Sequence, residues 1–236
     1  MDTKTLQENQ RLINFWDQAL ALSEEEREEL RQIGPESWKE IAPSEKLFQA
    51  AASLAECKSV LDYGCGNAWA GIIAAKSGCP DVTAADPAPG AVSAAGVYAA
   101  AYGAEKQMRI TLAGEGWLQN VPAETYDGIV CSNVLDVVPP ETAAEIIREL
   151  ARISKRGAKV IIGLNFYLSP EAAARRNMEL ADGNRLYVDG VLRLVSRSDD
   201  EWKQAFAPFF TAERLEHFAW PGEEAETRRL FYLRKS

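Results

Sequence analysis

From Lys58 onward, short apolar runs alternate with longer stretches of helical periodicity. The runs at 59–63, 82–85, 108–112, 128–132 and 159–164 have the length of strands, and most are apolar at successive positions. Such runs are typical of strands that are buried on both faces of a sheet. The stretches at 68–76, 89–102 and 141–154 lie between them and have the spacing of helices. This alternation predicts an α/β fold with a doubly wound, mainly parallel sheet.

The last part of the chain breaks this alternation. Two β-rich runs, 185–188 and 191–195, flank the dipeptide Asp189-Gly190, which is a strong signal for a β-hairpin. A capping box from Ser198 to Glu201 then starts another helix, which we expect to end near Pro208. The runs 213–220 and 228–233 follow as a closing pair of strands. We therefore expect a small hairpin insertion at about 165–197, followed by the end of the sheet.

The first 57 residues differ in charge and pattern from the rest. They hold 12 acidic and 6 basic residues, and Ser23 and Glu26 form another capping box. An apolar stripe with helical spacing precedes it and consists of Leu12, Phe15, Trp16 and Ala19. We expect an N-terminal helical cap at 1–57 and a larger domain at 58–236.

Composition limits the classes of partner. The 236 residues carry a net charge of -9, which would repel a nucleic-acid backbone, so we expect no nucleic-acid partner. No window is apolar enough to span a membrane, and the start MDTKTLQENQR lacks the features of a signal peptide, so the expected location is the cytoplasm.

His217 is most simply structural, and we expect no metal site and four buried free thiols, at Cys57, Cys65, Cys79 and Cys131.

The stretch VLDYGCGNAWAG follows the first expected strand and opens the first helix behind it. Glycines there let a ligand approach the backbone at a helix N-terminus, as in adenine-cofactor sites. The dinucleotide pattern G-x-G-x-x-G would require a third glycine at position 69, which is occupied by Trp69. Asp62 would repel a pyrophosphate but attract a cation. Both details favour a ligand with adenosine at one end and a cationic amino acid at the other, which is S-adenosylmethionine.

The segment Asp62-Tyr63-Gly64-Cys65-Gly66 resembles the first motif of the class I S-adenosylmethionine-dependent methyltransferases, D-x-G-x-G-x-G. The third glycine of that motif is replaced here by Ala68. The resemblance implies a seven-stranded Rossmann-like sheet with an antiparallel last strand. It also implies that Asp62, Gly64, Cys65 and Gly66 belong to the cofactor site.

Three further segments resemble motifs of the same family, in the same order. Asp86, followed by Pro87, ends the second expected strand, where the family places the acid that accepts from both ribose hydroxyls. After the third expected strand, Ala113-Gly114-Glu115-Gly116-Trp117 resembles the family's G-D-A segment, which implies that Glu115 lies near the adenine amino group and Trp117 beside the ring. The segment YDGIVCSNVLDVVPPE at 126–141 resembles the stretch beside the methionine part of the cofactor. The residues that the resemblance adds to the cofactor site are Asp86, Pro87, Glu115, Gly116, Trp117, Cys131, Ser132 and Asn133.

Each of these residues also has a structural interpretation, which the sequence leaves open. Asp62 could accept a hydrogen bond as a helix cap, and Asp86 could initiate a turn. Glu115 could be a solvated loop residue, and the tryptophans could simply pack in the core.

The resemblance implies an enzyme that transfers a methyl group by in-line displacement to a small molecule. Asp136 is the nearest candidate for a general base, should the acceptor need one. In this family the acceptor is usually covered by N-terminal helices and by later insertions. The aromatic residues there are candidates to line an apolar acceptor site: Phe15, Trp16, Trp38, Phe166, Tyr167 and Tyr187. Trp69, in the helix after the glycine-rich stretch, is a further candidate to face the substrate.

Two alternatives remain open from the sequence. A nicotinamide-dependent oxidoreductase would use a similar loop, although Trp69 and Asp62 argue against it. A non-catalytic scaffold or sensor would keep the same pocket without turnover. The methyl acceptor, its reacting atom and the oligomeric state have no signal in the sequence.

Overall fold

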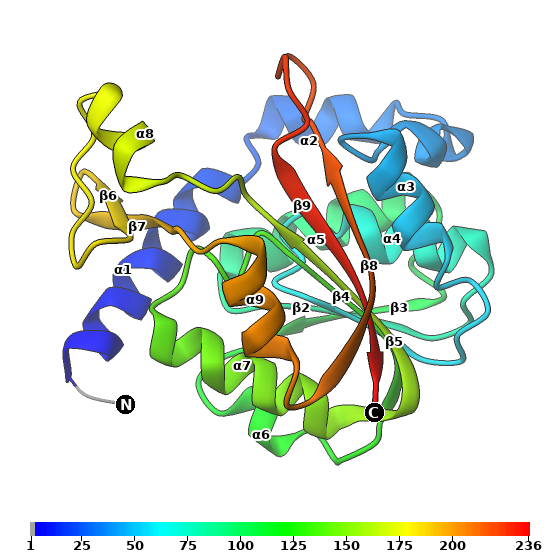
Figure 1. The fold of residues 1–236 in the computed structure, drawn as a ribbon. Coiled ribbons are helices and arrows are strands. Elements are labelled where there is room, and N and C mark those ends of the chain that lie inside the picture. Colours follow the sequence, from blue (N-terminus) through cyan, green and yellow to red (C-terminus); the bar gives the residue numbers. More distant parts are fainter. Residues whose placement is uncertain (1–2) are drawn as a thin grey trace.

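The structure, a computed structural model, describes residues 3–236. Its centre is a seven-stranded sheet with the order β3-β2-β1-β4-β5-β9-β8 (Figure 1). The first five strands in this order pair parallel, whereas β9 runs antiparallel to both of its neighbours. Their bounds are β1 Val60–Tyr63, β2 Val82–Asp86, β3 Met108–Leu112, β4 Tyr126–Ser132, β5 Ser154–Leu164, β8 Phe210–Phe218 and β9 Arg228–Lys235. This confirms the predicted α/β fold with a mainly parallel sheet and an antiparallel last strand.

Helices cover both faces of the sheet, as the alternation predicts (Figure 1). One core cluster joins a first group of helices to the sheet, namely α3 (Glu45–Ala52), α4 (Trp69–Ser77) and α5 (Pro89–Ala101). A second cluster joins another group, namely α6 (Trp117–Asn120), α7 (Pro140–Ile153) and α9 (Asp199–Phe206). The sequence of each helix fits its surroundings: α7 is amphipathic with one buried stripe, whereas α4 is apolar all round because α3 covers its outer side.

The N-terminal region forms helices before the sheet begins. They are α1 (Thr3–Leu20), α2 (Glu24–Arg31), a 3₁₀ helix η1 (Pro35–Glu40) and α3. The predicted capping box at Ser23 and Glu26 is present at the start of α2. The α1 helix contacts α5 and β7 (Val191–Val195), and its Leu12 is buried in the second core cluster. The helical character of this region is confirmed, while the domain boundary at residue 57 stays a prediction.

The insertion, residues 165–197, contains α8 (Pro170–Arg175) and the hairpin of β6 (Arg185–Val188) and β7 (Val191–Val195). Asp189 and Gly190 both have positive φ, as the two-residue turn requires. The insertion has a small apolar cluster of its own around Leu168, Ala173 and Leu194. The predicted hairpin is confirmed, and the insertion stands beside α1 in Figure 1.

Strand ends differ from the sequence prediction where polar residues extend a strand. β5 begins at Ser154 rather than at residue 159, because Ser154 pairs with Tyr126 across an irregular register. β8 spans Phe210–Phe218 rather than 213–220, and its side chains are mostly exposed because it lies at the edge of the sheet. Hydrophobic runs locate the buried part of a strand but miss such polar ends.

All four cysteines are buried with free thiols, as predicted. Within residues 3–236, no helix has the length and apolar character needed to cross a bilayer.

Candidate functional site

The loop after β1 has an unusual backbone that only part of its sequence explains. Gly64, Gly66 and Ala68 all lie in the left-handed region, with φ of 67°, 56° and 62°. Glycine adopts this conformation freely, but alanine does so at a cost of about 1 kcal/mol. The amides of Gly64 and Cys65 donate to the carbonyl oxygen of Ala85 at 2.8 and 3.2 Å. The loop is thereby fixed to the end of β2.

Gly64 also brings the loop against the end of β4. A Cβ at this position would lie 2.2 Å from Cγ2 of Val134, so no larger residue fits without displacement. The carboxyl ends of β1, β2 and β4 are neighbours in the sheet. Their loops therefore converge at one edge, where open α/β sheets bind ligands.

Asp62, in β1, is almost fully buried beneath this loop. Its Oδ2 accepts a hydrogen bond at 2.8 Å from the amide of Gly71 in the first turn of α4. Burial raises the pKa of Asp62 to about 7; the Gly71 bond opposes this increase and the Asp86 carboxylate adds to it. The structural interpretation of Asp62 as a helix-capping acceptor is thus present in the structure. Its contact with a ligand stays a prediction.

Asp86 is the last residue of β2, and it is also buried. Its two oxygens accept backbone hydrogen bonds, Oδ2 from Gly66 at 3.0 Å and Oδ1 from Ala88 at 2.9 Å. Burial raises the pKa of Asp86, and these two bonds oppose the increase. Pro87 follows at the start of the turn into α5. The Gly66 bond places the carboxylate directly beside the glycine-rich loop, as the predicted site requires.

The loop after β3 contributes an aromatic pair. Trp117, the first residue of α6, stacks on Tyr63 with ring centroids 6.5 Å apart. Gly116 caps this helix with a φ of 76°. Glu115 is exposed to solvent. The Tyr63–Trp117 contact brings the loop after β3 to the end of β1.

The end of β4 holds the clearest unfilled acceptor in the site. Asn133 has a left-handed backbone with φ of 57°, and its amide donates to the carbonyl of Gly163 at 2.8 Å. Its side-chain Oδ1 is buried and has no hydrogen-bond partner among residues 3–236. Ser132 packs so tightly on Gly163 that a Cβ there would lie 2.4 Å from its Oγ. Cys131 is fully buried in the strand.

These residues fit the predicted cofactor. A buried acceptor without a donor is costly, and an ammonium group is a donor that Asn133 Oδ1 could accept from. The buried carboxylates of Asp62 and Asp86 also favour a cation, because burial disfavours the charge of both and the Asp86 carboxylate further disfavours the charge of Asp62. Gly64 and Gly66 give the loop its left-handed backbone, and both residues are only partly buried.

The α1 helix lies across this edge. Oδ1 of Asp17 accepts the amide of Gly90, at the start of α5, at 2.6 Å. A Cβ on Gly90 would lie 2.1 Å from the carbonyl oxygen of Asp17, so the two backbones approach closely. Leu20 lies 3.9 Å from the position that a Cβ on Gly66 would take. The helix therefore shields the loop after β1.

The candidate acceptor-site aromatics do not gather in one cluster. Phe15 and Trp16 form an edge-to-face pair at 5.1 Å, and the guanidinium of Arg193 in β7 lies over both rings. Tyr187 donates to Oε1 of Glu8 in α1 at 3.0 Å. The others lie elsewhere: Trp38 and Trp69 pack against the first core cluster, Phe166 packs in the insertion, and Tyr167 is 47% exposed.

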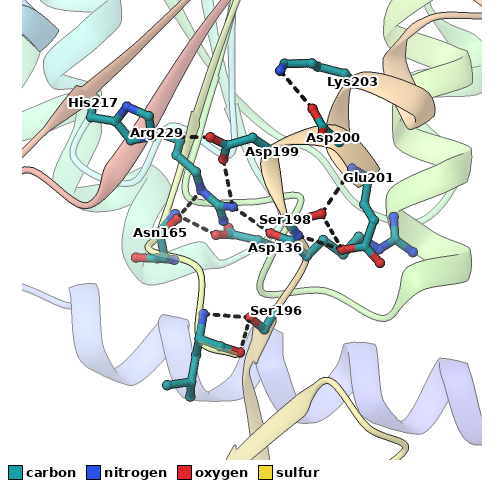
Figure 2. A network of polar contacts seen from close by, with 12 residues as sticks. Asp136, Asn165, Ser196, Ser198, Asp199, Asp200, Glu201, Lys203, His217 and Arg229 are labelled. Atoms are coloured by element: carbon teal, nitrogen blue, oxygen red, sulfur yellow. Dashed lines mark hydrogen bonds and ion pairs between the residues drawn. The ribbon is translucent and has the colours of Figure 1, made fainter. Parts of the chain in front are cut away.

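Tyr167 instead lines an open groove of about 650 Å³ beyond β5. The groove also contains His217, whose Nε2 lies 3.4 Å from Oδ2 of Asp199 (Figure 2). Arg229 of β9 lines it as well and is almost fully buried. The sequence motifs assign no functional role to Asp199 or Arg229. The signal for Arg229 is its position at the head of the apolar run RRLFYL, where a charged residue is unusual.

Asp136, the candidate general base, is fully buried behind β4. Its Oδ2 accepts the amide of Asn165 at 2.6 Å (Figure 2). Burial raises the pKa of Asp136 to about 6, while the Asn165 bond and the charge of Arg229 oppose the increase. Its catalytic role stays a prediction, and the geometry places it among the supports of the insertion.

Comparisons with known proteins agree with this architecture. No curated protein matches the chain. Among solved structures, magnesium protoporphyrin IX methyltransferase from Synechocystis PCC 6803, with bound S-adenosylhomocysteine, shares 17% identity over 81% of this chain and 82% of its own, with a TM-score of 0.59. An N-methyltransferase from Bradyrhizobium japonicum WM9, in complex with the same ligand, shares 18% identity over 80% of this chain and 84% of its own, with a TM-score of 0.55.

A third structure concerns the conversion of a disulfide bond into a thioacetal group during echinomycin biosynthesis. It shares 22% identity with this chain, covers 84% of each chain and has a TM-score of 0.60. At these identities the likeness concerns the fold.

The family is shown by the sequence itself. The methyltransferase-domain family matches residues 30–219, which is most of the chain. The match includes the loops after β1, β2, β3 and β4 and leaves α1 outside. It confirms the predicted enzyme class and its cofactor, S-adenosylmethionine. The chain belongs to the methyltransferase-domain family, with the fold of the class I S-adenosylmethionine-dependent methyltransferases.

Proposed function

We propose that the protein transfers a methyl group from S-adenosylmethionine to a small-molecule acceptor. The observation that carries this proposal is the buried, unpartnered Oδ1 of Asn133 at the edge where the Asp62 and Asp86 carboxylates are also buried. These are acceptors and negative charges without a cation among residues 3–236. They suit a ligand that brings an ammonium group and ribose hydroxyls.

Each residue has a defined part in this proposal. Asp62 and Asn133 hold the ammonium group, and Asp86 accepts from the ribose hydroxyls while it fixes Gly66. Glu115 lies at the adenine amino group, with Trp117 against the ring. Gly64 and Gly66 let the ligand approach the backbone.

The bound cofactor supplies an electrophilic methyl group on a sulfonium. The protein then needs to align the acceptor and to exclude water, since alignment is the main requirement of an in-line displacement. The α1 helix and the insertion lie beside each other over the carboxyl edge and provide that cover. A site enclosed in this way suits a small acceptor better than a polymer, and the net charge of -9 does not favour a nucleic acid.

Calorimetry tests the cofactor site. We expect S-adenosylmethionine and S-adenosylhomocysteine to bind the wild type and NAD not to bind. Asp86→Ala should weaken S-adenosylhomocysteine binding at least tenfold. Asp81→Ala is the matched control, because Asp81 directly precedes the opposite end of the same strand and pairs with Arg109. Binding of NAD without binding of either sulfur ligand would refute the proposal in favour of an oxidoreductase.

A transfer assay tests the acceptor class. The protein is incubated with methyl-tritiated S-adenosylmethionine and a cell extract that is separated into small molecules, RNA and protein. Label in the small-molecule fraction supports the proposal, whereas label only in RNA or protein contradicts it. Cofactor binding with no label in any fraction would favour a scaffold or sensor. The cytoplasmic location stays a prediction that cell fractionation can test.

A further inference from the structure

The insertion, residues 165–197, is attached to the rest of the protein at its two ends. It leaves the sheet after β5 at Asn165, and it returns through Val195 and Arg197 to Ser198, which caps α9. Its apolar cluster is small and mostly its own. Apart from contacts of its hairpin with α1 and α7, its position relative to the sheet therefore depends on what holds these two ends.

Asp136 holds both ends from the side of β4. Its Oδ2 accepts the amide of Asn165 at 2.6 Å, and its backbone carbonyl accepts the amide of Val195 at 2.7 Å. One residue therefore binds the first residue of the insertion and the last residue of β7. These bonds are sheltered from water because Asp136 is fully buried.

Arg229 holds the same two ends from the side of β9 (Figure 2). Its Nε donates to the carbonyl of Asn165 at 2.8 Å, and its Nη1 donates to the carbonyl of Arg197 at 2.6 Å. Nη1 also lies 3.4 Å from Oδ1 of Asp199, at the start of α9. The planar guanidinium has several donors in fixed directions, so it can fix two carbonyls relative to each other.

A third link ties the two ends to each other. The hydroxyl of Ser196 donates to the carbonyl of Leu168 at 2.8 Å and accepts the amide of Leu168 at the same distance (Figure 2). With the bonds of Asp136 and Arg229, the ends of the insertion form one buried polar junction.

The buried polar atoms of this junction cost folding free energy, so a contribution to stability alone does not explain why they are there. Oδ1 of Asp136 and Nη2 of Arg229 are buried without a hydrogen-bond partner among residues 3–236. Well-packed apolar side chains in place of buried charges are often neutral or stabilising. Hydrogen bonds are directional, whereas apolar contacts are not, so the hydrogen bonds of the junction fix the orientation of each end of the insertion.

The insertion contacts α1, so its position affects the position of that helix. Tyr187 of β6 binds Glu8 of α1, and Arg193 of β7 lies 4.2 Å from the ring centroid of Phe15. The same helix covers the glycine-rich loop through Leu20 and binds the start of α5 through Asp17. A displaced insertion would therefore also release the cover of the cofactor loop.

We propose that Asp136 and Arg229 are positioning residues, which hold both ends of the insertion so that it stays over the carboxyl edge of the sheet beside α1. Asp136 then acts through the insertion rather than as a general base. The inference that the insertion thereby covers the acceptor site rests on the proposed function.

Hydrogen exchange measured by mass spectrometry tests the junction in the full chain. In Arg229→Met and Asp136→Leu, we expect amides in 165–197 to exchange at least tenfold faster, while β1 and β4 keep their protection. Asp136→Asn should stay within about threefold of the wild type, because its amide oxygen can still accept from Asn165. Arg234→Met is the matched control, since Arg234 lies at the far end of β9 and pairs with Glu213.

Arg229→Met removes the positive charge that favours ionised Asp136, so this variant is paired with the double variant Asp136→Asn/Arg229→Met, which buries neither charge. Fast exchange confined to the insertion in both proteins supports the proposal. Unchanged exchange of 165–197 in the double variant, or an equal loss of protection throughout the sheet, overturns it. Failure of Asp136→Asn to preserve protection that Asp136→Leu loses also overturns the role given to the acceptor oxygen.

Calorimetry with S-adenosylhomocysteine on the same proteins separates the two proposals. A wild type that does not bind would refute the proposed function, while the exchange data would still decide the role of the junction. If the wild type binds, we expect Asp136→Leu to bind at least fivefold more weakly than Asp136→Asn. Equal affinities would overturn the transmission from the junction through α1.

Discussion

Replacement of Asp62 by asparagine separates what this carboxylate does for the cofactor from what it does to the fold. Asp62 is buried, and its pKa of about 7 compares with an ordinary value of 3.8. A difference of about three pH units corresponds to about 4 kcal/mol. The ionised form is thus strongly disfavoured in the folded protein, and the wild type bears this cost at neutral and alkaline pH.

The sign follows from linkage. Because the folded-state pKa is raised, the folded protein binds a proton at Asp62 more tightly than the unfolded chain does. The stability from this proton is fully present below about pH 4 and is lost as the pH rises through about 7. Asparagine does not titrate, so the variant lacks this loss.

We expect Asp62→Asn to be more stable than the wild type at pH 8 and close to it at pH 5. Its amide oxygen can still accept from Gly71, but its NH₂ group needs a partner, and a buried unpaired donor costs about 1–3 kcal/mol. The net gain at pH 8 is therefore about 1–3 kcal/mol. Urea unfolding at both pH values measures it. Asp86 and Asp136 titrate in both proteins, so their contributions largely cancel in the comparison.

The same change should weaken S-adenosylhomocysteine binding at least tenfold at pH 8, since a neutral amide attracts an ammonium group less than a carboxylate does. A stability difference that does not change between pH 5 and pH 8 would refute the assignment of a raised pKa. A more stable variant with unchanged affinity would instead show that Asp62 only caps α4.

Three further changes test other parts of the structure. Gly64→Ala should lower the melting temperature markedly, because its Cβ would meet Val134 at 2.2 Å; Gly64→Ala/Val134→Ala should recover only part of the loss, since the positive φ remains. Ser198→Ala should cost about 1 kcal/mol in urea unfolding, since it removes the capping box of α9. Asp17→Ala removes the acceptor for Gly90 and should speed proteolysis within α1, with circular dichroism of the sheet unchanged. Equal cleavage of both proteins would count against α1 as a cover held by that bond.

The fold could be predicted because its signals are local. Alternating apolar runs indicate strands that are buried on both faces, and the hairpin turn needs the positive φ that Asp189 and Gly190 have. The loop residues Asp62 and Asp86 lie at strand ends, which parallel pairing brings to one edge. For these features, position along the chain determines position in space.

The rest depends on contacts between distant segments, which have no local signal. The position of Asp136 just after β4 suggested a general base, but the sequence does not show that its carboxylate binds Asn165. Likewise, the sequence predicts that aromatic residues, mainly of α1 and of the insertion, line one acceptor site. The helical stripe places Trp16 against the core correctly, but it does not show that Trp69 packs on the other face of the sheet.

At Ala68, a local sequence motif and contacts between distant segments determine the same backbone conformation. The family motif has glycine there, and in this chain alanine adopts the same left-handed backbone, with a φ of 62°. Its cost of about 1 kcal/mol is offset by the hydrogen bonds that fix the loop on both sides, in which the amide of Gly64 donates to the carbonyl of Ala85 and the amide of Gly66 donates to the Asp86 carboxylate. The motif therefore reports a backbone shape that its surroundings enforce. Because those surroundings include Asp86, the shape of the loop and the carboxylate predicted to bind the ribose depend on each other.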